Sequence, residues 1–307
     1  MDDESPRSGR CAIIGRPNVG KSTLLNALLG QKLAITTAKP QTTRTSLLGV
    51  LMVPEPPTQL AFVDTPGWHD PAGALGRALV ESAKGSMESA DVLVLVVEVP
   101  VRAASSSPLT RQDLMVLEAA KATGRPLVLA INKIDRARDK RRLLPMLEQC
   151  ARLHPFAALV PLAARSGKNV AQLVGALREH LLPGLMYDPE LLTDRPERFF
   201  AAEFVREAVI EHTRQEVPYG AAVVVDEFRD EPGISHISAT IVVEKASHKG
   251  IVIGQGGSLL KSIGTAARLQ LEAFLERKVF LELWVKVVPG WTRDARRVRE
   301  FAGDEPQ

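Results

Sequence analysis

Residues 15–22, Gly15-Arg16-Pro17-Asn18-Val19-Gly20-Lys21-Ser22, match the pattern GxxxxGK(S/T) and follow directly on the short apolar run 11–14. This arrangement predicts a strand, a glycine-rich loop and a helix over about 21–29. Backbone N–H groups of such a loop, together with the positive end of the helix dipole, surround an anion. The motif therefore predicts a site for the phosphates of a nucleotide, in which Lys21 reaches the β- and γ-phosphates and Ser22 ligates Mg²⁺.

A second motif, Asp64-Thr65-Pro66-Gly67, follows the apolar run 60–63, which predicts a buried strand. The carboxyl ends of parallel strands meet at one edge of a sheet, so we expect Asp64 beside the phosphate loop. There its carboxylate can hold the Mg²⁺ shell, and the Gly67 N–H can contact the γ-phosphate. A turn that only ends a strand would use similar residues, and the position of the motif is what favours the nucleotide site.

A third motif, Asn132-Lys133-Ile134-Asp135, follows the apolar run 127–131. A carboxylate at Asp135 can accept hydrogen bonds from guanine N1–H and the exocyclic amine, neither of which adenine donates there. A buried polar group left without its partner discriminates strongly between ligands. We expect Lys133 to lie over the base plane and to brace the phosphate loop. The three motifs in this order predict an enzyme that binds and hydrolyses GTP.

Composition places the chain among ordinary globular proteins, with 45% hydrophobic and 24% charged residues. Only Cys11 and Cys150 are present, so we expect no disulfide framework and a reducing compartment. Residues 1–10 are polar and lack the apolar core of a signal peptide. The longest apolar stretch, 92–101, is interrupted by a glutamate and a proline and is too short to span a bilayer. We expect a cytoplasmic protein.

The sequence pattern changes near residue 190. Up to about residue 180, strand-like runs alternate with helical segments, which predicts an α/β domain with a mostly parallel sheet and helices on both faces. Prolines and a glycine then predict a linker. The expected organisation is a disordered tail at 1–8, the α/β domain at 9–182, the linker at 183–197, a second domain at 198–300 and a tail at 301–307.

The second half predicts a small α+β domain with the order helix, strand, strand, helix, GxxG, helix, strand. The tetrad is Gly254-Gln255-Gly256-Gly257. This order is typical of a type II KH domain, whose GxxG loop clamps the backbone of single-stranded RNA. Residues 245–299 hold 11 basic and 4 acidic residues, whereas 197–244 hold 4 basic and 10 acidic. The basic concentration suits a phosphate partner. A structural glycine turn beside a solvated basic face would give the same counts.

Taken together, these residues resemble the Era family of bacterial GTPases over roughly 9–300. The segments that carry the resemblance are 15–22, Gln41-Thr42-Thr43-Arg44, 64–67, 132–135, 193–200 and 248–250. The resemblance implies GTP hydrolysis coupled to binding of small-subunit ribosomal RNA near its 3′ end, and assistance to assembly of the small ribosomal subunit. It also implies peripheral association with the inner membrane.

Further site residues are implied by the resemblance. The switch I threonine falls on Thr43, with Thr42 as the neighbour that could take its place, and its hydroxyl completes the Mg²⁺ shell when the γ-phosphate is bound. Trp68 stands where many GTPases have a glutamine that orients the attacking water, and an indole has no carbonyl oxygen to hold that water. Related GTPases use an asparagine of the phosphate loop, here Asn18, to hold K⁺ near the β- and γ-phosphates.

Two departures from the family concern the bases of the nucleotide and the RNA. Ala163 and Ala164 stand where the family has a serine and an alanine, and we expect the Ala164 N–H to reach guanine O6 without help from a hydroxyl. Gln255 stands where a lysine is frequent, so the expected RNA clamp carries one charge less.

The candidate residues form three groups. Lys21, Thr43 and Asn18 are the expected catalytic residues. The nucleotide site comprises Gly15, Arg16, Pro17, Asn18, Val19, Gly20, Lys21, Ser22, Thr23, Asp64, Thr65, Pro66, Gly67, Asn132, Lys133, Asp135 and Ala164, with Ser22, Thr43 and Asp64 on Mg²⁺ and Asn18 on K⁺. The RNA site comprises His248, Lys249, Gly254, Gln255, Gly256, Gly257, Lys261 and Arg268. An alternative is a nucleotide-gated signalling protein whose second domain contacts a protein or an anionic membrane surface.

Overall fold

The computed structural model describes residues 5–37, 39, 42–68, 73–99, 108–137, 141, 143–213 and 217–302. The chain forms two compact units. The first comprises Met1–Ala34, Ser46–Asp70 and Leu79–Asp194, and the second comprises Ile35–Thr45, Pro71–Ala78 and Arg195–Gln307. The second unit therefore resumes at Arg195, inside the linker expected at 183–197. It also includes Ile35–Thr45, a segment that the sequence analysis assigned to the first domain.

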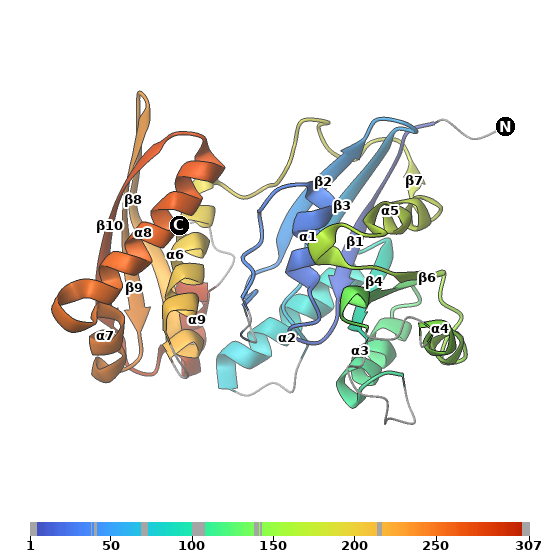
Figure 1. The fold of residues 1–307 in the computed structure, drawn as a ribbon, viewed down its shortest axis with the longest axis horizontal. Coiled ribbons are helices and arrows are strands. Elements are labelled where there is room, and N and C mark those ends of the chain that lie inside the picture. Colours follow the sequence, from blue (N-terminus) through green and yellow to red (C-terminus); the bar gives the residue numbers. More distant parts are fainter. Residues whose placement is uncertain are drawn as a thin grey trace. The chain divides into compact units, whose positions relative to one another are not determined.

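The first unit is built on a seven-stranded sheet with the order β2-β3-β1-β4-β5-β6, and β7 pairs with β1 (Figure 1). Its strands are β1 (Arg7–Ile14), β2 (Leu47–Val53), β3 (Thr58–Asp64), β4 (Val92–Glu98), β5 (Leu127–Asn132), β6 (Ala158–Pro161) and β7 (Leu182–Pro183). Strands β3, β1, β4, β5 and β6 are parallel, whereas β2 forms an antiparallel hairpin with β3. The expected mostly parallel sheet is confirmed. The short antiparallel β7 was not expected, because it lies at the boundary between the expected α/β domain and the proline-rich linker.

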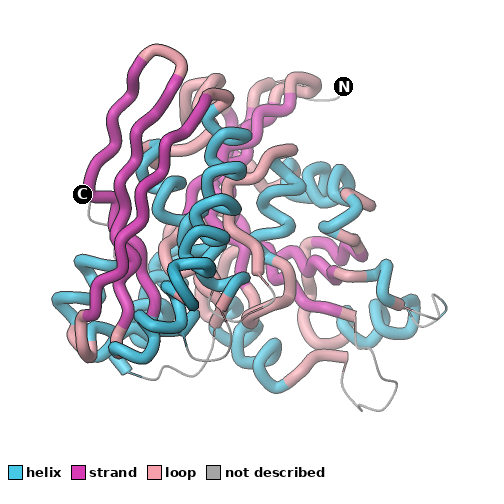
Figure 2. Tube along the Cα trace, turned by 60° about the vertical axis from the view of Figure 1, so that its left-hand side comes forward, coloured by secondary structure: helices cyan, strands magenta, loops and turns pink. Residues whose placement is uncertain are grey.

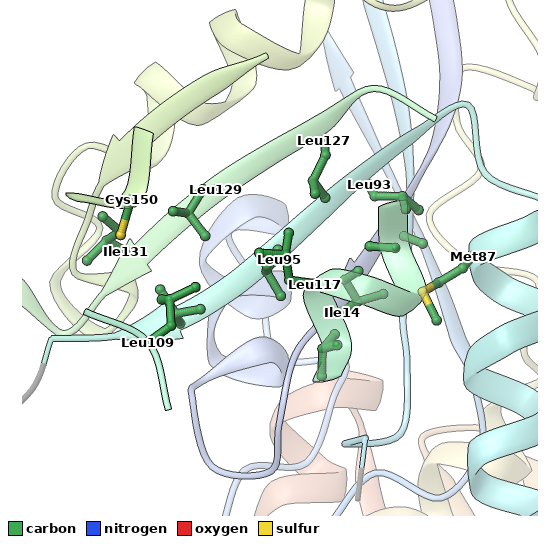
Figure 3. Close-up of a cluster of buried hydrophobic side chains, with 14 of the residues drawn as sticks. Ile14, Met87, Leu93, Leu95, Leu109, Leu117, Leu127, Leu129, Ile131 and Cys150 are labelled. Atoms are coloured by element: carbon green, nitrogen blue, oxygen red, sulfur yellow. The ribbon is translucent and has the colours of Figure 1, made fainter. Parts of the chain in front are cut away.

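Helices cover both faces of this sheet. They are α1 (Lys21–Leu29), α2 (Gly73–Glu88), α3 (Arg111–Lys121), α4 (Leu143–Ala151) and α5 (Val170–Arg178). Leu93 and Leu95 of β4 belong to a buried cluster that includes Leu117 of α3 and Cys150 of α4 (Figure 3). The residues between them, such as Val94, point to the opposite face and are equally buried. Both faces of β4 are therefore in the core, as its continuous apolar run predicts.

The parallel strands bring four loops to one edge of the sheet. In the strand register, Ile13 of β1 pairs with Asp64 of β3, and Glu98 of β4 pairs with Asn132 of β5. The loops that follow these strands therefore start side by side. This edge is where ligands bind in open α/β sheets.

The second unit has the three-stranded sheet and helix order predicted from the sequence (Figure 2). Its elements are α6 (Glu197–His212), β8 (Ala221–Glu231), β9 (Ile234–Val243), α7 (Ala246–Ile253), α8 (Ser258–Leu275), β10 (Lys278–Val287) and α9 (Ala295–Ala302). The sheet order is β10-β9-β8, with β9 antiparallel to β8 and parallel to β10. Phe200 and Phe204 of α6 pack against Phe274 of α8. The α+β fold is confirmed, and α9 is an element that was not expected.

Within the described part of the chain, every helix is too short or too polar to cross a lipid bilayer.

Candidate nucleotide and RNA sites

The phosphate loop joins β1 to α1 through two glycines that no other residue could replace without a shift. Gly15 has φ 152°, and a Cβ there would lie 2.5 Å from the Val96 carbonyl oxygen. Gly20 has φ 101°, and its Cβ would lie 2.4 Å from Asn132 Nδ2. Both the backbone conformation and the close approach of neighbours therefore require glycine. The helix α1 begins directly after Gly20, so its positive end faces the loop.

Three polar residues, Lys21, Ser22 and Asp64, are hydrogen-bonded at or next to the phosphate loop. Lys21 Nζ donates to the carbonyl oxygens of Gly15 at 3.2 Å and Arg16 at 3.3 Å. Burial lowers the pKa of Lys21 to about 8; the charge of Asp64 opposes this shift, and that of Arg16 adds to it. Ser22 Oγ donates to Asp64 Oδ2 at 2.7 Å. A hydroxyl and a carboxylate side by side are hard oxygen donors of the kind that Mg²⁺ prefers, so this pair fits the expected ion.

The DxxG segment lies against the phosphate loop. Trp68 N donates to the Gly15 carbonyl oxygen at 3.1 Å, and Thr65 Oγ1 donates to the Ile13 carbonyl oxygen at 2.8 Å. A Cβ on Gly67 would lie 2.9 Å from Pro17 Cα, so the two loops approach too closely for any side chain at position 67. The structure thus brings the first and second motifs together, as expected from the strand order.

Asn132 connects three loops through one buried amide. Its Nδ2 donates to the Val19 carbonyl oxygen at 2.8 Å. Its Oδ1 accepts from the backbone N–H groups of Lys133 at 2.7 Å and Ala164 at 3.0 Å. One side chain, which is only 2% exposed, therefore holds the phosphate loop, the loop after β5 and the loop after β6. We call the loop after β5, which begins at Lys133 and includes Asp135, the base-reading loop after its predicted role.

The remaining residues of the predicted base site follow the ends of β5 and β6. Asp135 is exposed in a single 3₁₀ turn, Ile134–Arg136. Lys133 has φ 63°, and its Nζ donates to the Asn18 carbonyl oxygen at 2.6 Å. The Ala164 N–H is bonded to Asn132, so a contact with guanine O6 would share this donor. The contacts of Asp135 and Ala164 with a base stay predictions.

Thr43 belongs to Ile35–Thr45, which packs within the second unit. Its neighbour Arg44 is buried and donates to the Ala221 carbonyl oxygen at 2.7 Å. On the other side, the Thr42 carbonyl oxygen accepts from a buried arginine of α6 at 2.5 Å. The choice between Thr43 and Thr42 as a Mg²⁺ ligand stays a prediction.

The GxxG loop joins α7 to α8 through three glycines at positive φ. Gly254 has no room for a side chain, because a Cβ would lie 2.7 Å from Leu259 Cβ. Gly256 and Gly257 have φ 58° and 81°, and a Cβ on either would meet no atom within 4 Å. The tip of the loop is therefore open. An open tip leaves the backbone accessible to a phosphate.

The expected RNA-binding side chains differ in accessibility. Lys261 is exposed on α8, and Lys249 is half-buried on α7. Arg268 forms an ion pair with Glu272 at 3.0 Å, so a phosphate would compete with this carboxylate. His248 is only 7% exposed, and a direct contact between its ring and RNA would require the surrounding side chains to move. Lys261 and the loop backbone are thus the most accessible of the predicted contacts.

Comparisons with known proteins agree with this architecture. A family model described as 50S ribosome-binding GTPase matches residues 10–133, and one described as KH domain matches residues 216–292. The GTPase Era of Syntrophus aciditrophicus is 45% identical over 302 residues, which cover 97% of this chain and 96% of that protein. The GTPase Era of Coxiella burnetii is 44% identical over 302 residues, which cover 97% of this chain and 98% of that protein.

The chain belongs to the Era family of GTPases. Two solved Era structures have the same fold across both units, each with a TM-score of 0.91 and 39% identity over 97% of this chain and 99% of theirs. One is a variant of Aquifex aeolicus Era bound to GDP·AlF4⁻. The other is Era in complex with MgGDPNP and nucleotides 1506–1542 of 16S ribosomal RNA. The GTPase activity and the KH fold predicted from the sequence are confirmed.

Sequence reasoning missed residues that contact the phosphate loop and the base-reading loop without belonging to the motifs. Glu98 was noticed only as the charge that interrupts an apolar run, yet it ends β4 and contacts both Arg16 and Lys133. Asp113 of α3 is 2% exposed and lies 3.2 Å from Arg16 Nε. An acidic residue at the end of a buried strand was the one signal that could have indicated Glu98.

Substituting Asp135→Asn should weaken GTP binding by about an order of magnitude, because an amide accepts guanine's two donors poorly. Xanthosine triphosphate should bind better relative to GTP, because its donor pattern suits the amide. Competition against a fluorescent guanine nucleotide measures both affinities, with Asp188→Asn in the same unit as the control. Equal GTP affinity in wild type and Asp135→Asn would remove Asp135 from the base pocket.

Proposed function

We propose that this protein is a GTP-driven switch that binds the 3′ end of small-subunit ribosomal RNA and assists assembly of the small ribosomal subunit. The observation that carries the proposal is the joint presence of a complete phosphate loop and an open GxxG tip in one chain. It is supported by the 39% identical Era whose structure contains MgGDPNP and nucleotides of 16S ribosomal RNA. The protein acts in the cytoplasm in this proposal, with peripheral contact with the inner membrane.

The roles of individual residues are part of the proposal. Residues 9–182 bind and hydrolyse GTP, and residues 198–300 bind RNA, with 183–197 as the linker between them. Ser22 and Asp64 hold Mg²⁺, and Thr43 joins them when the γ-phosphate is present. Magnesium would neutralise charge on the β- and γ-phosphates, and Lys21 would exchange its bonds to loop carbonyls for bonds to phosphate oxygens.

The Gly254–Gly257 loop is proposed as the RNA clamp. Gly256 and Gly257 have positive φ, and a Cβ on either would meet no atom within 4 Å, so a phosphate can approach the backbone of the tip closely. The helix α8 begins at Ser258, so its positive end lies directly behind the loop. Exposed Lys261 follows one turn later. These features favour a phosphate backbone as the partner and carry no information about its bases.

The substitution Gly256→Asp should weaken RNA binding about tenfold, mainly because it places a negative charge at a loop that faces phosphates. Space is not the reason, since a Cβ at position 256 meets nothing within 4 Å. Gly256→Asn separates charge from backbone strain, because asparagine tolerates φ 58° as well as aspartate does. The measurement is fluorescence anisotropy with a 12-nucleotide RNA copied from the small-subunit 3′ end.

Gly233→Asp is the matched control for this experiment. Gly233 has φ 82° and open space around it, but it lies in the turn between β8 and β9. This control should bind RNA like the wild type. A separate variant, Lys261→Gln, should reduce the slope of log RNA affinity against log salt concentration by about one unit. Wild-type RNA affinity in a folded Gly256→Asp protein would contradict the clamp. If the wild type and Gly256→Asp then also bound anionic lipid vesicles equally well, the signalling alternative would be favoured.

Hydrolysis should depend on K⁺, because Trp68 has no carbonyl oxygen to hold the attacking water and the proposal assigns the monovalent ion to Asn18. Replacing K⁺ by Na⁺ at constant ionic strength should slow phosphate release from GTP several-fold. Asn18 has φ 64°, so Asn18→Gly removes the side chain without backbone strain and should abolish the difference between the two salts. Asn18→Asp retains an oxygen ligand and should preserve it. Identical wild-type rates in both salts would refute the K⁺ site.

A further inference from the structure

The carboxylate of Glu98 binds cations from two different loops. Glu98 ends β4 beside Asn132, the last residue of β5. Its Oε1 accepts from Arg16 Nη2 of the phosphate loop, and its Oε2 accepts from Lys133 Nζ of the base-reading loop at 2.6 Å. Burial raises the pKa of Glu98, but the hydrogen bonds and charges of Lys133 and Arg16 outweigh it and hold the pKa below its ordinary value.

The side chain of Arg16 lies between two carboxylates. Besides Glu98, its Nε lies 3.2 Å from Asp113 Oδ1. Asp113 is fixed in turn, because it forms a capping box with Thr110 at the start of α3. The guanidinium is thus paired within the protein and held by a strand end and a helix start.

The two loops that Glu98 joins contain non-glycine residues at positive φ. Lys133 has φ 63°, and Asn18 has φ 64°. For a lysine this conformation is uncommon and persists where the surroundings impose it, whereas asparagine adopts it more readily. Lys133 Nζ binds the Asn18 carbonyl oxygen at 2.6 Å as well as Glu98, so both residues are linked to the same carboxylate.

We propose that Glu98 is a positioning residue for guanine nucleotide binding, which holds the phosphate loop through Arg16 and the base-reading loop through Lys133. The inference rests on the nucleotide site proposed above and adds a residue outside its motifs. Glu98 acts through these two cations and needs no contact with the nucleotide. A preorganised pair of loops binds its ligand without first paying to order them.

If Glu98 acted only through its charge, its removal would change nucleotide affinity in the opposite direction. Glu98 neutralises positive charge beside a site for polyphosphate, so its removal would strengthen the binding of an anion through charge alone. Positioning predicts that the same removal weakens binding, because Arg16 and Lys133 lose the group that fixes them. The substitution Glu98→Gln, which conserves size, therefore separates the two views by the direction of the change.

The test is the dissociation rate of a fluorescent GDP analogue from the full chain. Glu98→Gln should release it about tenfold faster, as expected for the loss of charge-assisted hydrogen bonds. Glu118→Gln is the control, because Glu118 forms an exposed ion pair with Lys121 on α3. Slower or unchanged dissociation from folded Glu98→Gln would overturn the proposal. Release by wild type at a measurable rate establishes the nucleotide site independently of this outcome.

A double-mutant cycle distinguishes positioning from a general loss of stability. If Glu98 acts partly through Arg16, Glu98→Gln should accelerate release less in the Arg16→Met background than in the wild type, because only the path through Lys133 is left to lose. Additive effects would contradict that path. The melting temperature of the nucleotide-free protein provides the second readout. If the ion pairs of Glu98 were only structural, their loss would lower the melting temperature and leave the dissociation rate unchanged. Should Glu98→Gln fail to fold, Glu98→Asp keeps the charge, cannot reach both cations, and should also accelerate release.

Discussion

The amide of Asn132 is the contact on which the nucleotide site depends most. It donates to the Val19 carbonyl oxygen and accepts from the N–H groups of Lys133 and Ala164, all within 3.0 Å. Burial makes each of these bonds expensive to lose, at about 1–3 kcal/mol for a group left unsatisfied. The lack of a side chain at Gly20 follows from the same contact, because a Cβ would lie 2.4 Å from Asn132 Nδ2. Position 20 must therefore be glycine so that the Asn132 side chain can lie against the phosphate loop.

The sheet supplies the frame in which this contact forms. Parallel pairing of β4 with β5 puts Glu98 next to Asn132. Glu98 contacts the cationic side chains of the phosphate loop and the base-reading loop, and Asn132 bonds to the backbones of the same two loops. Charge and hydrogen bonding therefore connect the same two loops from adjacent strand ends. An ordered site before the nucleotide arrives lowers the cost of binding it. Lys21 completes this picture, because burial holds its pKa near 8 until a phosphate can pair with it.

Much of the fold could be predicted because its signals are local. Apolar runs that end in 15–22, 64–67 and 132–135 indicated parallel strands with loops at one edge, and a helix on each side of GxxG indicated the second unit. Family resemblance added Thr43 and Asn18, whose roles no local pattern indicates. The expected fold of each unit is confirmed.

Contacts between residues far apart in the sequence could not be predicted. Arg16 and Glu98 are 82 residues apart, and periodicity carries no information about such pairs. For the same reason the packing of Ile35–Thr45 within the second unit was missed, since its polar composition suggested a loop of the first domain. The burial of His248, a predicted RNA contact, was also missed, because the local sequence does not show which side chains pack around it.

The two activities belong to one switch only if a nucleotide in the first unit changes the RNA affinity of the second. The direct measurement is the affinity of the full chain for the 12-nucleotide 3′-end RNA with Mg²⁺ and a non-hydrolysable GTP analogue, with Mg²⁺ and GDP, and without nucleotide. We predict the tightest binding with the GTP analogue, by about tenfold over GDP, and an equal factor in the reverse effect of RNA on GTP-analogue affinity. The same RNA affinity in all three states would contradict the account.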